Sequence, residues 1–214
     1  MTVRKETGGD AKSKKLLFNQ NITFSLGVTQ IENLPEEDVA EVAFFGRSNV
    51  GKSSLLNSIT NKNKLAYTSK NPGRTRELNF FSLRQNSKTL INIVDMPGYG
   101  FAKASKDQIK KWTKLSDSYL KTRKNLRRVF LLIDSRRNIM SIDNEIMDIM
   151  DDYAVSYQIV LTKADKILKV ENLAELVLKE VEKRKAIFPK ILITSSKSKF
   201  GIDDIREEIA SLIN

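Results

Sequence analysis

One run of residues has the spacing needed to bind phosphates. The letters GRSNVGKS fill positions 46–53, after the apolar run 41–45 and before a stretch with apolar residues at helical spacing. Glycines at both ends let the backbone wrap around an anion, so that amides and a helix N-terminus point at it. Lys52 can place its charge on β- and γ-phosphates, and the Ser53 hydroxyl can ligate Mg²⁺. The predicted nucleotide-binding residues here are Gly46, Arg47, Ser48, Asn49, Val50, Gly51, Lys52, Ser53 and Ser54.

A second loop, with the letters DMPG, comprises Asp95, Met96, Pro97 and Gly98. It follows an apolar strand pattern, so its carboxylate stands at a strand end. Asp95 can hold Mg²⁺ directly or through water, and the Gly98 amide can reach a γ-phosphate. Because parallel strands end at one edge of a sheet, this loop is predicted to lie beside the phosphate loop.

Two further loops indicate which base is bound. Thr162, Lys163, Ala164 and Asp165 follow another strand pattern. A carboxylate at Asp165 can accept from the N1–H and the exocyclic amine of guanine, a pair of donors that adenine lacks, while the Lys163 stem can cover the ring. After the last strand pattern, backbone amides can meet the guanine O6. That segment is Thr194, Ser195, Ser196 and Lys197. The loops therefore favour GTP over ATP.

Composition excludes several other chemistries. The 214 residues contain neither cysteine nor histidine, which excludes disulfides, zinc–thiolate sites and Ser-His-Asp hydrolysis. The longest apolar run, residues 129–133, is far too short to cross a bilayer, and the N-terminal residues lack the apolar centre of a signal peptide. We therefore expect a soluble, cytoplasmic protein.

The net charge of +11 is unevenly distributed along the chain. Residues 61–76 carry five Lys or Arg and no acid, and residues 103–128 carry ten against Asp107 and Asp117. The rest of the chain is slightly negative in sum. A localised positive field of this kind is typical of a surface that meets nucleic acid or an anionic membrane, the alternative being an ordinary solvated lysine-rich face.

The elements that must position these loops alternate between strands and helices. Strand patterns cover 22–26, 41–45, 78–84, 89–95, 127–134, 157–161 and 190–194, with a hairpin turn at 85–87. One helix is predicted directly after the phosphate loop, and a second has Ile109, Trp112, Leu115 and Tyr119 on one face. Two more are predicted at 141–153 and about 170–187, and a final helix aligns Ile205, Ile209 and Leu212. This alternation predicts an α/β fold with a mostly parallel sheet and helices on both faces. Residues 1–17 are predicted to be a flexible basic tail, and 18–214 a single domain.

The motifs GRSNVGKS, PGRT, DMPG, TKAD and SSK, in this order, resemble those of translation-factor-class small GTPases. More closely, EVAFFGRSNVGKSSLLN with NPGRT and DMPGYGFA resembles the EngB (YsxC/YihA) family of bacterial ribosome-biogenesis GTPases, over roughly residues 18–213. The resemblance implies a three-layer, Ras-like P-loop GTPase fold whose six-stranded sheet has one antiparallel edge strand. It also implies GTP/GDP and Mg²⁺ binding, a role in assembly of the large ribosomal subunit, and a link to cell division and septation.

The same resemblance assigns roles to residues. Ser53 and Thr75 become Mg²⁺ ligands beside Asp95, with Thr68 as the competing threonine. The first switch spans 73–77, which adds Gly73, Arg74, Thr75, Arg76 and Glu77, and the second spans 95–105. Asn49 is the residue that would help hold a potassium ion, so the expected catalytic set is Lys52, Thr75, Gly98 and Asn49. Tyr99 replaces the water-orienting glutamine of many switch GTPases, and we therefore expect slow intrinsic hydrolysis.

The expected partner is the large ribosomal subunit or its precursors, met by a monomer through the surface of the GTPase domain itself. The charge distribution places the contact on a basic face of Lys70, Arg74, Arg76, Lys103, Lys106, Lys110 and Lys111. Two rival functions stay open on the sequence alone. One is a P-loop kinase for a small molecule, which would lack a TKAD-type guanine loop. The other is a septum- or membrane-associated scaffold that polymerises on GTP.

Overall fold

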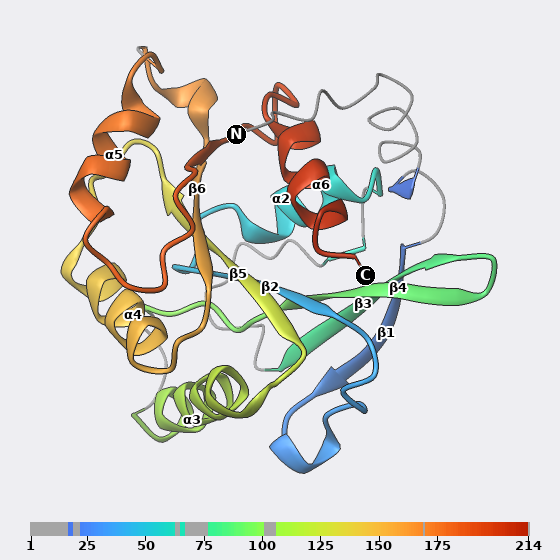
Figure 1. Ribbon diagram of the computed structural model, residues 1–214. Coiled ribbons are helices and arrows are strands. Elements are labelled where there is room, and N and C mark those ends of the chain that lie inside the picture. The colour runs from blue at the N-terminus through green and yellow to red at the C-terminus, as the bar shows by residue number, and fades with distance from the viewer. Residues whose placement is uncertain are drawn as a thin grey trace, which may run out of the picture.

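A seven-stranded sheet forms the centre of the molecule (Figure 1). The computed structural model describes residues 17–18, 22–62, 65–66, 77–100, 106–168 and 170–213, with backbone alone for 106–113. The strand order is β1-β3-β4-β2-β5-β6-β7. In chain order the strands are β1 (Ile22–Val28), β2 (Glu41–Gly46), β3 (Leu78–Gln85), β4 (Lys88–Asp95), β5 (Leu126–Asp134), β6 (Tyr157–Thr162) and β7 (Leu192–Ile193).

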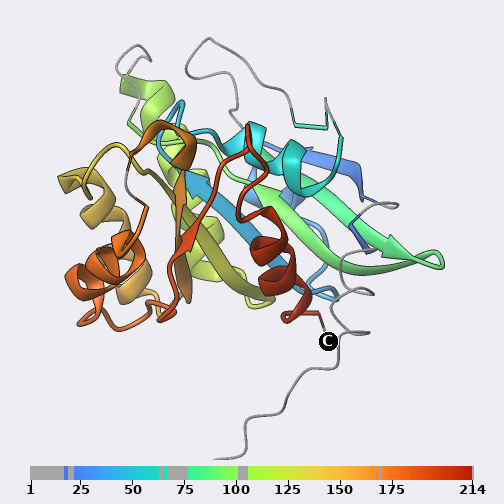
Figure 2. The same cartoon turned by 90° about the horizontal axis from the view of Figure 1, so that it is seen from above.

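Helices cover both faces of this sheet (Figures 1 and 2). They are α2 (Lys52–Ile59), α3 (Lys106–Thr122), α4 (Ser141–Asp152), α5 (Leu173–Val181) and α6 (Ile202–Ala210). Apolar side chains of α2 and α6 join one core cluster, and those of α3, α4 and α5 join the other. The predicted α/β architecture with helices on both faces is thereby confirmed.

Strand β2 shows why the central strands read as continuous apolar runs. Its residues are all buried. Val42 and Phe44 pack into the cluster under α2 and α6, whereas Ala43 and Phe45 pack into the opposite one. Because successive side chains of a strand point to opposite faces, a strand covered on both sides needs apolar residues at nearly every position. Because β2 is buried on both faces, the start of the phosphate loop is held in the sheet.

Strand β3 is the one strand of the described sheet that runs against the others, since it pairs antiparallel with both β1 and β4. The six-strand sheet with an antiparallel edge strand therefore needs a correction: there are seven strands, and β1 covers the edge of β3. The hairpin between β3 and β4 turns at Asn86 and Ser87, whose φ angles are 48° and 66°. Two consecutive positive φ angles are the mark of the tight hairpin turn predicted at 85–87.

The last two predicted elements before α6 are shorter than the sequence pattern indicates. Helix α5 ends at Val181 and not near 187, because tertiary contacts draw the following residues toward β6 and α4. Arg184 bonds to Asp148 and Asp151, and the Ala186 amide donates to the Asp151 carboxylate at 2.8 Å. Strand β7 keeps only Leu192–Ile193 of the predicted 190–194.

Two of the cations counted in the basic segment 103–128 are buried in ion pairs. Arg123 donates to the carboxylate of Glu41, which is fully buried and also accepts from the Tyr119 hydroxyl. Arg128 pairs with Glu208 at 2.8 Å. These pairs fasten α3 to the start of β2 and α6 to β5. The positive surface of this segment is accordingly smaller than its composition suggests.

The first described residues belong to the core, since Phe18 is 1% exposed and lies in the cluster under α2 and α6. Apart from Leu17, the predicted tail lies outside the described residues. In the described part of the chain, every helix is too short or too polar to cross a bilayer.

Candidate functional site

The phosphate loop runs from the end of β2 to the start of α2, as the sequence predicts. Its turn requires left-handed backbone at Asn49 (φ 64°) and Gly51 (φ 107°), and Val50 between them is buried. Asparagine tolerates this conformation better than most residues, and glycine adopts it without strain. Gly51 is the N-cap of α2 and has no side chain to cap the helix, so the first amides of α2 remain available to an anion.

On the phosphate side of this loop, the Lys52 ammonium contacts the Asp95 carboxylate. Both side chains are largely buried, with Lys52 9% and Asp95 4% exposed. Ser53 stands next to Lys52 in the first turn of α2. A hydroxyl and a carboxylate beside a phosphate-binding loop are hard oxygen donors of the kind Mg²⁺ prefers, so these residues fit that ion.

The second loop is held against the phosphate loop by backbone hydrogen bonds. The Tyr99 amide donates to the Gly46 carbonyl at 3.2 Å, and the Ser48 amide donates to the Tyr99 carbonyl at 3.0 Å. The Ser48 hydroxyl donates to that same carbonyl. A Cβ on Gly98 would lie only 3.1 Å from the Gly46 carbonyl oxygen, so glycine is needed for this close approach. Met96 and Pro97 are buried, and Met96 belongs to the core.

The Tyr99 side chain points toward α4. Its hydroxyl donates to Asp143 at 2.7 Å, and its ring meets Phe45 edge-on with centroids 5.0 Å apart. Burial, together with the neighbouring Asp143 carboxylate, raises the pKa of Tyr99 far above its usual range. Asp143 in turn caps α4 by accepting from the Met140 amide. The side chain at the usual glutamine position is therefore committed to an anchoring contact.

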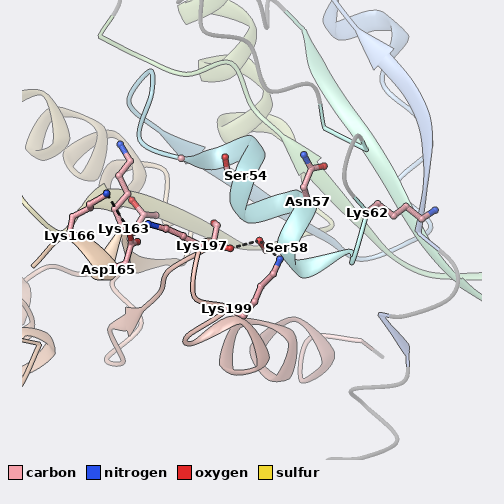
Figure 3. A pocket seen from close by; sticks show the side chains of 12 residues that line it. Ser54, Asn57, Ser58, Lys62, Lys163, Asp165, Lys166, Lys197 and Lys199 are labelled. Carbon is pink, nitrogen blue, oxygen red and sulfur yellow. Dashed lines mark hydrogen bonds and ion pairs between the residues drawn. The ribbon is translucent and has the colours of Figure 1, made fainter.

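A cavity of about 480 Å³ opens on the other side of the phosphate loop (Figure 3). Figure 3 shows Lys163, Asp165 and Lys166 together at one end and Asn57 and Lys62 at the other. The lining residues are Gly51, Ser54, Asn57, Ser58, Lys62, Thr162, Lys163, Asp165, Lys166, Ser196, Lys197 and Lys199. The cavity thus joins the phosphate loop to both of the predicted guanine loops.

Asp165 is prepared to act as an acceptor in this cavity. The Ser195 hydroxyl donates to it at 2.7 Å, and this bond holds the pKa of the carboxyl below its usual value. A carboxylate fixed in this way can receive the two donors on one edge of guanine. Sequence reasoning gave Ser195 a role through its amide, but that amide donates to the Phe200 carbonyl at 3.0 Å. Its hydroxyl is the group that serves the cavity.

Two side chains of the loop after β6 bind it to the phosphate loop. The Thr162 hydroxyl donates to the Val50 carbonyl at 2.7 Å, and the Lys163 ammonium donates to the Asn49 carbonyl at 2.7 Å. Lys163 adopts a left-handed backbone conformation (φ 61°), and its stem passes over Gly51. The same ammonium donates to Asp134, at the end of β5, at 2.9 Å.

Thr194 and Ala164 support the cavity without lining it. The Ala164 amide donates to the Thr194 carbonyl, and the buried Thr194 hydroxyl donates to the Leu161 carbonyl at 3.0 Å. Ser196 and Lys197 are the members of the last predicted loop that line it. Glu77 is half-buried beside Gly27. Four predicted site residues, Gly73, Arg74, Thr75 and Arg76, and the rival Thr68 lie outside the described residues.

A second pocket, of about 280 Å³, lies next to the phosphate loop and is bounded by the chain after β5. Its lining includes Arg47, Asn49, Asp134, Arg136 and Lys163. Asn49, the predicted potassium ligand, is exposed here. Sequence reasoning missed Asp134 and Arg136. The position of Asp134 could have indicated its role, because it ends a strand at the same edge of the sheet as the four predicted loops.

Comparison with known proteins supports the nucleotide-binding interpretation. A family model described as "50S ribosome-binding GTPase" matches residues 41–163, more than half of the chain. A probable GTP-binding protein EngB of Hyphomonas neptunium is 50% identical over 201 residues, covering 92% of this chain and 90% of that protein. The corresponding Rhodospirillum rubrum protein is 49% identical over 199 residues, covering 92% and 86%.

Solved structures share the fold. A crystal structure of a probable GTP-binding protein engB has a TM-score of 0.64 at 23% identity, covering 81% of this chain and 98% of that one. Era of Aquifex aeolicus bound to GDP and aluminium fluoride has a TM-score of 0.69 at 23% identity, covering 82% and 57%. Another Era structure, with the same score and identity, covers 82% and 57% and contains MgGDPNP and nucleotides 1506–1542 of 16S ribosomal RNA.

Proposed function

The chain belongs to the EngB family of GTP-binding proteins and is a GTPase, and we propose that it assists assembly of the large ribosomal subunit. We extend the proposal to cell division and septation, which the family resemblance implies. The protein acts in the cytoplasm, as a monomer, and alternates between GTP-bound and GDP-bound states. The family assignment also favours a GTPase over the small-molecule kinase considered from the sequence.

In this proposal the two sides of the site divide the work of binding GTP. The first amides of α2 and Lys52 bind the phosphates, and the Gly98 amide meets the γ-phosphate. Asp165 receives the donors of guanine, Lys163 covers the ring, and the loop of Ser196 and Lys197 closes over the base. Support comes from the cavity that brings Gly51, Lys163 and Asp165 together.

Mg²⁺ is general for GTPases, and we assign Ser53, Thr75 and Asp95 as the residues that hold it. When bound, the ion neutralises charge on the phosphate oxygens. Asn49 is the proposed helper of a potassium ion. Because Tyr99 is held by Asp143, hydrolysis by the isolated domain should be slow, on the order of 10⁻⁴ to 10⁻³ per second. Potassium should raise the rate over sodium at fixed ionic strength, and equal rates in the two salts would remove Asn49 from the catalytic set.

The observation that carries the ribosomal role is the match to a family whose description names 50S ribosome binding. Era, a fold relative of which 57% of the chain is matched, was solved in complex with a segment of 16S ribosomal RNA, and this is consistent with a ribosomal role. The positive segments 61–76 and 103–128 add an electrostatic reason, because phosphate backbones attract local positive fields. Both segments adjoin the loops that we expect to respond to the γ-phosphate.

Co-sedimentation with purified ribosomal subunits tests this role. Binding to the large subunit should be tighter with a non-hydrolysable GTP analogue than with GDP, because γ-phosphate contacts order the switch loops. It should weaken with salt, with a log–log slope of roughly −4 if about five cations meet phosphates. Charge reversal at Lys110 and Lys111 should weaken subunit binding and leave GTP affinity intact. Binding that ignores both nucleotide and salt would reject the role, although the chain would remain a GTPase.

A further inference from the structure

Asp134 is a buried carboxylate that the proposed binding scheme does not use. It is the last residue of β5 and is 9% exposed. It lines the smaller, 280 Å³ pocket but not the larger cavity, whereas Lys163 lines both. Lys163 therefore separates the two pockets, and Asp134 reaches it from the side opposite the base.

Four hydrogen bonds converge on the Asp134 carboxylate. Arg136 donates from Nε at 2.9 Å, from Nη2 at 2.7 Å and from its backbone amide at 3.1 Å. The Lys163 ammonium donates to Oδ2 at 2.9 Å. Burial by itself would raise the pKa of Asp134, but the bonds from Arg136 and Lys163 hold it well below its usual range. The carboxylate is thus charged at neutral pH and fixed in orientation by Arg136.

Lys163 needs such a partner because its side chain has four rotatable bonds and ends in a strongly hydrated charge. The Asn49 carbonyl fixes the ammonium at 2.7 Å from the phosphate loop, and Asp134 supplies the one carboxylate with which it pairs among the described residues. With both acceptors in place, the stem crosses Gly51 at the mouth of the cavity. That is where a guanine ring held by Asp165 would pack.

We propose that Asp134 is a positioning residue for guanine-nucleotide binding, which acts by holding Lys163 between the phosphate loop and the base. This inference rests on the proposed role of the Lys163 and Asp165 loop in guanine recognition. Asp134 itself touches neither phosphate nor base in this scheme. Asp134 keeps the Lys163 stem ordered before the nucleotide binds, so binding loses less side-chain entropy.

Whether Asp134→Asn weakens or tightens nucleotide binding separates a positioning role from a purely electrostatic effect of the Asp134 charge. GDP and GTP are anions that the Asp134 carboxylate repels, so loss of that negative charge would by itself tighten their binding. Positioning predicts the opposite for Asp134→Asn: weaker binding by about tenfold, the scale of one lost hydrogen bond to a charged group. The loss should appear mainly as faster dissociation of a methylanthraniloyl-labelled GDP, because the site is otherwise preformed.

A double-mutant cycle with Lys163→Met tests whether Asp134 acts through the lysine. In the Lys163→Met background, Asp134→Asn should cause no further weakening of GDP binding. Arg136→Ala should weaken GDP binding less than Asp134→Asn does, because the charged carboxylate and its bond from the Arg136 backbone amide remain. Arg137→Ala, which removes a guanidinium from the next position on the same loop, is the matched control and should behave like the native protein.

Asp134→Asn leaves Arg136 and Lys163 close together, so its thermal transition is measured first. If this variant does not fold, the double variant Asp134→Asn, Arg136→Ala restores the charge balance and still lacks the charged acceptor. Affinity that is unchanged or higher in a folded Asp134→Asn variant, or equal weakening with and without Lys163, overturns the inference. If Lys163→Met alone leaves GDP affinity unchanged, the proposed guanine loop itself fails, which is a separate result.

Discussion

The base side and the phosphate side of this site are built in different ways. On the base side, Asp165, Lys163 and Thr162 are held by partners that a nucleotide has no need to displace, such as Ser195 and the Val50 carbonyl. On the phosphate side, Lys52 contacts Asp95, and Tyr99 is bonded to the phosphate loop. A bound phosphate and its metal ion would compete for these same groups.

This difference teaches where selectivity and switching can reside. Groups that are fixed before binding give up little free energy on meeting the ligand, so they suit a step that must always be the same, the recognition of guanine. Groups that exchange partners can respond to whether a γ-phosphate is present. We therefore expect substitutions on the base side to change affinity in every nucleotide state, and those on the phosphate side to change the difference between states.

Asp165→Asn should have the largest effect and would break the base side alone. The amide cannot accept both guanine donors, so GTP and GDP should each lose affinity on the order of 10³-fold. Xanthosine nucleotides should gain, because the amide can donate to the carbonyl that replaces the exocyclic amine. Competition titrations with GTP, GDP and the two corresponding xanthosine nucleotides measure this change in base preference. Equal affinity of the native protein for ATP and GTP would refute guanine recognition by Asp165.

Lys52→Ala should come next, and its loss should fall on the phosphates. We expect roughly 100-fold weaker GDP binding, because the variant lacks a largely buried charge that in the proposed scheme meets the β-phosphate. The cooperative thermal transition should persist at a lower temperature, since the change lies where β4 meets the start of α2 and Asp95 is left without its cation. Calorimetry without nucleotide provides the check, and complete unfolding would mark Lys52 as a structural residue.

Tyr99→Phe should have a smaller and more selective effect. Loss of the bond to Asp143 should lower the free energy of unfolding by about 1 kcal/mol and loosen the second loop, which keeps its backbone bonds to Gly46 and Ser48. GDP affinity should stay within about twofold, while the preference for a GTP analogue over GDP should rise by roughly fivefold. Tyr153→Phe is the matched control, because Tyr153 donates to Asp117 at 2.7 Å outside the site. Equal nucleotide preferences in both variants would contradict the anchoring role of Tyr99.

The loops on both sides of the site could be predicted from the sequence. Strand ends at Gly46, Asp95 and Thr162 follow from apolar runs, and the loops that follow them have strong local patterns. The structure brings the loops together as predicted: the loop after Thr162 shares a cavity with the phosphate loop, and backbone hydrogen bonds join the loop after Asp95 to it. These features depend on short-range chemistry, which one sequence displays directly.

What the sequence did not display depends on pairs far apart in the chain. Asp134 and Lys163 are 29 positions apart, and Tyr99 and Asp143 are 44 apart, so no local pattern joins them. Tertiary contacts also ended α5 early and buried Arg123 and Arg128 within a segment that composition marks as surface charge. Each of these outcomes requires knowing which elements are neighbours in space.

Amide hydrogen exchange across nucleotide states tests the division between the two sides most directly. The native protein is compared with GDP and with a non-hydrolysable GTP analogue, both with Mg²⁺. Protection of the Ala164 and Ser195 amides, bonded to the Thr194 and Phe200 carbonyls, should be the same in both states. Protection of the Ser48 and Tyr99 amides should differ between them, because in the proposed scheme the γ-phosphate engages the second loop. Equal changes on both sides, or no change at Tyr99, would contradict the account.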